Sequence, residues 1–211
     1  MSSQKGRRRV LIGGLGAAAA AAATMGARPA GAQAASPFAP ARHAEDAWMG
    51  ALPGMHRVVL DVTTADAMPD AIRFTGNLFR GNQSGYDLGD RDLALIVCLR
   101  HSATAYGYDA GLWSKHGRML ESKTTPPPAA NPFNSGDRMQ LSGLAKRGVH
   151  FMVCGTASRG IAGRLAGAGG DADAMFKEME ANLIPNARIV SAGVVGVTRA
   201  QEYGFSYLFV G

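Results

Sequence analysis

One cysteine stands at the point where a predicted strand gives way to a predicted helix. The run Val149–Val153 is apolar and rich in β-branched and aromatic residues, which is typical of a buried strand, and small and polar residues follow Cys154. Open α/β sheets place ligands and reactive groups at the carboxyl ends of their strands. A helix beginning near Thr156 would stabilise a thiolate there, so Cys154 is the candidate nucleophile. The alternative is a buried, inert thiol, because free cysteine is among the most buried residue types.

A histidine follows the second apolar run at an equivalent position. His101 follows the predicted strand 92–99 and can share the sheet's carboxyl edge with Cys154. It can act as a general base or donate a hydrogen bond to an anion, and the alternative is a loop histidine bonded to the backbone. Together Cys154 and His101 are the predicted catalytic pair. The polar and small residues around them form the predicted binding set, which is Arg100, Gly155, Thr156 and Arg159.

Other candidate chemistries are weaker. His116 and His150 do not combine with a cysteine at a ligand spacing, so no metal site is expected. The Gly167–Gly170 segment lacks a preceding strand and the glycine order of a dinucleotide loop, which favours a flexible loop. No Ser-His-Asp order or paired-carboxylate spacing indicates a hydrolase. No cofactor is expected.

The residues that position these candidates alternate between strand and helix patterns. Strands are predicted at 56–62, 92–99, 148–154, 188–192 and 205–210. Helices are predicted at 69–80 with Gly81 as the stop, at 110–116, at 140–147, from Asp171 or Asp173 to about 183, and at 194–203. This alternation predicts an α/β domain with a doubly wound, mainly parallel five-stranded sheet and helices on both faces.

Two further segments have distinct compositions. Residues 122–137 contain Pro126-Pro127-Pro128 and Pro132, which excludes regular structure and favours an exposed loop or a lid over the site. Tyr106, Tyr108 and Trp113 follow the second strand and are expected to pack the core or a subunit interface, with a pocket wall as the second interpretation.

The first 34 residues have the features of a signal peptide. Arg7-Arg8-Arg9 precede apolar residues in the twin-arginine pattern, a weakly apolar Ala/Gly stretch follows, and small residues end the segment near Ala34. The apolar stretch is shorter than the roughly 20 residues that a membrane span needs. We therefore expect export to the periplasm by the twin-arginine pathway and no membrane contact after cleavage. Residues 35–55 are expected to form a linker or an N-terminal arm with a helical turn around Glu45–Met49, before a domain over 56–211.

The net charge of +6 belongs mostly to this leader. Five of the 22 basic residues lie before Ala35 with no acid among them, which leaves 17 basic against 16 acidic residues in the rest of the chain. The remaining charge of +1 gives no reason to expect a nucleic-acid partner. With only Cys98 and Cys154, one disulfide is the maximum, so a core must hold the domain together.

Four segments resemble the DsrE/DsrF-like family of sulfur-relay proteins, which have a small α/β sandwich of the YchN type. They are Leu95–His101, Leu144–Cys154, Ile189–Val194 and Gln201–Leu208. The resemblance implies that Cys154 holds sulfur as a persulfide and that the subunits form trimers or hexamers. It also implies a 2-1-3 strand order, which separates Cys98 and Cys154 by two strand spacings, about 10 Å. Because a disulfide needs Cα atoms within roughly 7 Å, both thiols are predicted to be reduced.

The sequence departs from that family in its export leader and in its longer proline-rich insert. The first hypothesis is a periplasmic sulfur carrier whose partners are a sulfur donor or acceptor protein or a small anion. The second is a non-catalytic small-ligand-binding or oligomeric assembly protein of the same fold. The third is a flavin or nucleotide carrier of flavodoxin-like kind.

Overall fold

The structure is a computed structural model that describes residues 39–121, 125–134 and 139–211, so the expected signal peptide lies outside the described residues. Residues from Pro40 onward form one compact unit. Its strands are β1 (His56–Val62), β2 (Leu93–Leu99), β3 (His150–Cys154), β4 (Ala187–Val190) and β5 (Ser206–Val210). Its α-helices are α1 (Ala47–Ala51), α2 (Met68–Tyr86), α3 (Ala110–Leu120), α4 (Leu141–Lys146), α5 (Gly155–Ala166), α6 (Ala172–Ala181) and α7 (Gly193–Glu202). Three 3₁₀ segments are η1 (Ala44–Asp46), η2 (Asp90–Asp92) and η3 (His101–Gly107).

The five strands form one parallel sheet in the order β4-β3-β2-β1-β5. This confirms the predicted doubly wound α/β class. The predicted 2-1-3 order is wrong, because β3 pairs directly with β2 and Cys98 lies opposite Met152. Both orders satisfy right-handed crossovers, so the alternation of strands and helices along the chain does not distinguish them.

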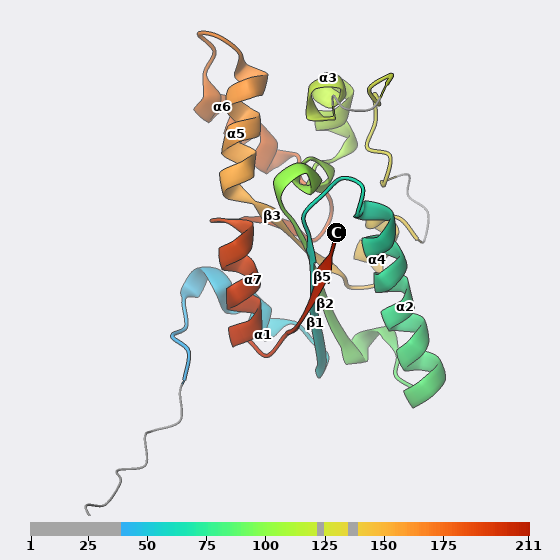
Figure 1. The fold of residues 1–211 in the computed structure, drawn as a ribbon. Coiled ribbons are helices and arrows are strands. Elements are labelled where there is room, and N and C mark those ends of the chain that lie inside the picture. Colours follow the sequence, from blue (N-terminus) through green and yellow to red (C-terminus); the bar gives the residue numbers. More distant parts are fainter. Residues whose placement is uncertain (1–38, 122–124, 135–138) are drawn as a thin grey trace, which may run out of the picture. The chain divides into compact units, whose positions relative to one another are not determined.

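The direction of each crossover decides which face its helix covers. From β1 to β4 the chain advances across the sheet in one direction, and α2 to α6 contribute to the core on one face. The connection from β4 to β5 returns across the sheet, so the right-handed rule places α7 on the opposite face. Figure 1 shows α7 and α1 on one side of the sheet and α2 and α4 on the other.

Each face of the sheet has its own core. The larger core contains the fully buried Trp113, Tyr108 and Phe151, and Tyr106 is buried there too, so all three predicted aromatic residues pack in the interior. The smaller core, under α7, contains Met49, Ile96 and Met152 among its fully buried side chains. The central strand β2 is buried along all seven residues, as expected for a strand covered on both faces.

The segment before β1 is an arm that packs on the smaller core. It contains η1 and α1, near the predicted helical turn, and Met49 of α1 is fully buried. The Arg57 guanidinium donates hydrogen bonds to the backbone oxygens of Met49 and Leu52, both at 3.0 Å. These bonds attach the arm to the first strand.

The glycines explain where the predicted helix ends differ from the observed ones. Helix α2 continues through Gly81 to Tyr86 and ends at Asp87, whose φ of 55° is left-handed. Likewise α5 continues through Gly160 and Gly163 and ends at Ala166. A glycine in an exposed helix costs about 1 kcal/mol relative to alanine, which tertiary packing readily offsets.

The proline-rich insert is irregular where the structure describes it. Residues 125–134 contain no helix or strand. The Asn131 side-chain amide donates to the backbone oxygens of Tyr106 and Tyr108 at 3.0 and 3.1 Å, which ties the insert to the segment that follows β2. Among all described residues, no helix has both the length and the hydropathy to cross a bilayer.

Candidate functional site

The carboxyl ends of β3 and β4 enclose a crevice because the helices that follow these neighbouring strands leave on opposite faces. Helix α5 follows β3 on the larger-core face, whereas α7 follows β4 on the other. Such a divergence is where open α/β sheets bind ligands. A cavity of about 290 Å³ opens there. Its lining consists of Arg100, His101, Cys154, Thr156, Ala157, Ala192, Gly193 and Val194.

Cys154 occupies the N-cap of α5 at the base of this cavity. The residue is 8% exposed and lines the cavity. The Gly193 backbone N–H, in the first turn of α7, donates to the Cys154 Sγ at 3.1 Å. The sulfur therefore faces the N-terminal ends of two helices, and their dipoles and the N–H donor would stabilise negative charge on it.

Gly193 is the residue that sequence reasoning missed. A Cβ at this position would lie 2.7 Å from the Arg100 Cβ, so only glycine permits the approach of α7 to the end of β2. The available signal was a glycine at a predicted strand-to-helix junction, inside the segment Ile189–Val194. Only the structure showed that this junction lies against Cys154.

Arg100 lines the cavity, but its guanidinium binds a carboxylate beneath it. Its Nε and Nη2 donate to the two Asp61 oxygens at 2.7 and 2.9 Å, and the Tyr207 hydroxyl also donates to Asp61 at 2.9 Å. The Asp61 side chain is 3% exposed and that of Arg100 16%. The two hydrogen bonds to Asp61 hold the Arg100 side chain against Gly193. Arg100 therefore shapes the wall of the cavity, while its charge is paired with Asp61.

His101 stands on the rim of the cavity. Its φ of 51° is left-handed, a conformation that non-glycine residues adopt mainly at turns and functional sites. The side chain is exposed, and with Ala157 it also lines a second cavity on its other side. The structure thus brings His101 and Cys154 to one cavity.

The remaining predicted binding residues divide into two groups. Thr156 lines the cavity, and its hydroxyl donates to the Ser191 backbone oxygen at 3.3 Å. Gly155 lies beneath it, where a Cβ would come within 2.6 Å of the Val190 oxygen. Arg159 does not line the cavity: its guanidinium lies over the Phe176 ring and 3.8 Å from Asp173.

Cys98 has a different environment although it lies on the neighbouring strand. It is fully buried, and its Sγ donates to the Gly193 oxygen at 3.6 Å. Burial raises the pKa of the Cys98 thiol, and the nearby Asp61 carboxylate raises it further. Both cysteines are free thiols. The strand geometry separates their Cα atoms by about 8 Å, which exceeds the disulfide limit of roughly 7 Å for a reason other than the predicted one.

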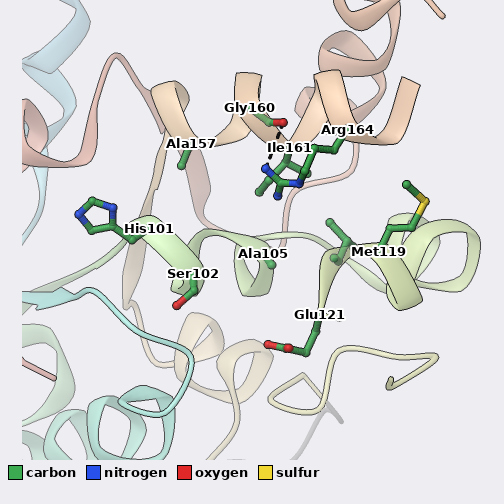
Figure 2. Close-up of a pocket in the computed structure, with 10 residues that line it drawn as sticks. His101, Ser102, Ala105, Met119, Glu121, Ala157, Gly160, Ile161 and Arg164 are labelled. Atoms are coloured by element: carbon green, nitrogen blue, oxygen red, sulfur yellow. Dashed lines mark hydrogen bonds between the residues drawn. The ribbon is translucent and has the colours of Figure 1, made fainter. Parts of the chain in front are cut away.

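The second cavity, of about 510 Å³, runs from His101 and Ala157 along α5 (Figure 2). Its walls come from η3, the end of α3, and α5. The lining residues are His101, Ser102, Ala105, Met119, Leu120, Glu121, Ala157, Gly160, Ile161 and Arg164. Among the described residues, no group of three or more histidine, cysteine or acidic side chains is placed to hold a metal ion.

No protein-family model matches the chain, and no curated protein matches it. The site must therefore be interpreted from its own geometry.

Proposed function

We propose that the protein is an exported DsrE-like sulfur carrier that holds sulfane sulfur as a persulfide on Cys154. The observation that supports this most directly is the Cys154 sulfur itself, which accepts the Gly193 N–H at the base of an open cavity. A sulfur atom that accepts a backbone N–H and belongs to a residue that lines a cavity at the N-terminal ends of two helices has the environment of a reactive thiol. The resemblance of the four segments adds the family's chemistry to this proposal.

The transfer step needs only the donor and the thiolate. The Cys154 thiolate attacks the outer sulfur of a donor persulfide, R–S–S–H, the donor S–S bond breaks, and R–S⁻ leaves. The products are Cys154–S–S–H and a thiolate, so atoms and charge balance. His101, on the cavity rim, can give a proton to the leaving sulfur.

The cellular setting of this proposal comes from the sequence. The twin-arginine leader supports export to the periplasm, and the resemblance supports a trimer or hexamer. The partner would be a sulfur donor or acceptor protein or a small anion.

Mass spectrometry of the reduced protein after incubation with sodium polysulfide tests the function. We expect an added mass of one sulfur atom on the peptide that contains Cys154, reversed by a thiol reductant. Cys98→Ser should take up the same sulfur, whereas Cys154→Ser should take up none. An unmodified Cys154 peptide in folded wild-type protein would contradict the proposal.

The apolar lining favours a second candidate, a non-catalytic small-ligand-binding protein in which Cys154 is only part of the wall. In that case Cys154→Ser would retain the ligand and the phenotype of the wild-type protein. Retention of the ligand with loss of the phenotype in Cys154→Ser would exclude this candidate.

A further inference from the structure

The larger cavity beside the Cys154 site has the size and charge to hold the part of a substrate that does not react. It shares His101 and Ala157 with the Cys154 cavity, so the two lie on either side of one rim. A molecule whose sulfur enters the Cys154 cavity would pass His101 and extend along α5. The residues of the larger cavity that lie farther along α5 would then determine which group of the substrate is recognised.

Arg164 is the cation of the larger cavity. Its Nη1 donates to the Gly160 backbone oxygen at 3.2 Å, so the side chain folds back toward the start of α5, as Figure 2 shows. Gly160 follows Cys154 by six residues, about 9 Å along a helix axis. Among the residues that the structure describes, no carboxylate forms an ion pair with Arg164.

The acidic residue of the same cavity lies on the opposite wall. Glu121 is buried, and its Oε2 accepts a hydrogen bond from the Tyr106 hydroxyl at 2.8 Å. Figure 2 shows its carboxylate on the side away from Arg164. The wall formed by α5 is therefore the part of the cavity that attracts an anion.

We propose that the larger cavity holds the carboxylate-bearing tail of a small organic persulfide, with Arg164 as its counter-charge. This inference rests on the proposed function and names its substrate class. The outer sulfur of the donor reaches Cys154, the inner sulfur lies beside His101 and leaves as a thiolate, and the carboxylate binds Arg164. The separation of Cys154 and Gly160 along the axis of α5, about 9 Å, is of the order of the length of a small thiol whose carboxylate lies several bonds from its sulfur.

Two aromatic disulfides test the tail site on the reduced mature protein. Dithiobis(nitrobenzoate) has a carboxylate on each ring and dithiodipyridine has none, and both release a coloured thiolate when Cys154 attacks one of their sulfurs. We expect Arg164→Gln to lower the rate with the carboxylate reagent by about three- to fivefold, the range of an exposed ion pair. The rate with the neutral reagent should not change.

Arg91→Gln is the matched control, because Arg91 is an exposed arginine in η2, before the amino end of β2. It should leave both rates unchanged, and added salt should slow the carboxylate reagent in the wild type but not in Arg164→Gln. Equal effects of the two arginine substitutions, or equal effects on the two reagents, would overturn the tail site.

The two proposals can fail separately. If polysulfide adds sulfur to Cys154 while Arg164→Gln changes the rates with the two reagents equally, only the tail site is wrong. If Arg164 discriminates between the reagents while Cys154 takes up no sulfur, the tail site stands as an anion subsite and the carrier function is wrong.

Discussion

Cys98 and Cys154 lie on neighbouring strands, face the same side of the sheet and share one partner, yet their environments are opposite. Gly193 accepts from the Cys98 Sγ through its oxygen and donates to the Cys154 Sγ through its N–H. Cys98 lies inside β2, fully buried, with its thiol pKa raised by burial and by Asp61. Cys154 ends β3 and opens into a cavity.

The difference shows that position along a strand decides the chemistry more than the residue type does. Cys98 lies before the carboxyl edge of the sheet, where its thiol is enclosed in the core under α7. At the edge, the chain turns into a helix and the same group meets backbone N–H donors and solvent.

Alkylation with iodoacetamide under native conditions should separate the two thiols most widely. We expect Cys154 to react at least about a hundredfold faster than Cys98, because Cys98 lacks both exposure and thiolate character. Mass spectrometry of the two cysteine peptides over time measures the ratio, and Cys98 should react once the protein is unfolded. Equal rates in folded protein would remove the contrast.

The next largest expected effect is on the unfolding free energy, from the ion pair between Asp61 and Arg100 beneath the site. Asp61→Asn leaves the Arg100 charge without its carboxylate, which we expect to cost about 3 kcal/mol of unfolding free energy. Asp70→Asn breaks the exposed pair with Arg73 and should cost less than about 1 kcal/mol. Urea unfolding measures both, and equal costs would contradict the structural role of the Asp61–Arg100 pair.

Adding a methyl group to Gly193, which is hydrogen-bonded to both cysteines, should lower the stability of the protein. Gly193→Ala places a Cβ against Arg100, so we expect a loss of about 1–3 kcal/mol from overpacking and slower alkylation of Cys154. Gly163→Ala is the control with opposite sign, because a Cβ there meets nothing within 4 Å and should stabilise α5 by about 0.5–1 kcal/mol. A neutral Gly193→Ala would show that the close approach is not needed.

The smallest effect is expected at the amino end of β3, which is remote from Cys154 on the same strand. Burial and the neighbouring Arg188 lower the pKa of His150, whose Nδ1 is buried and has no hydrogen-bond partner among the described residues. Because the unfolded state then binds a proton more readily, stability should fall as pH drops below the unfolded value of about 6.5 and level off below the folded pKa. Urea unfolding against pH should show a flatter curve for His150→Phe than for the exposed control His56→Phe.

The sequence by itself determined the class of the fold and the place of the candidate thiol. The alternation of apolar runs with helical patterns was enough to predict the doubly wound sheet, and the break after Val153 was enough to place Cys154 at a strand end. Both depend on local patterning, which burial on two faces makes strong.

Only the tertiary structure decided which strands are neighbours and what surrounds the thiol. Pairing of β2 with β3, the return of the chain after β4, and the approach of Gly193 to Cys154 join segments about 40 or more residues apart. Arg100 turned out to bind Asp61, and Arg159 to lie outside the cavity. Such contacts depend on the order of strands, which local patterns leave open because several orders satisfy the same right-handed crossovers.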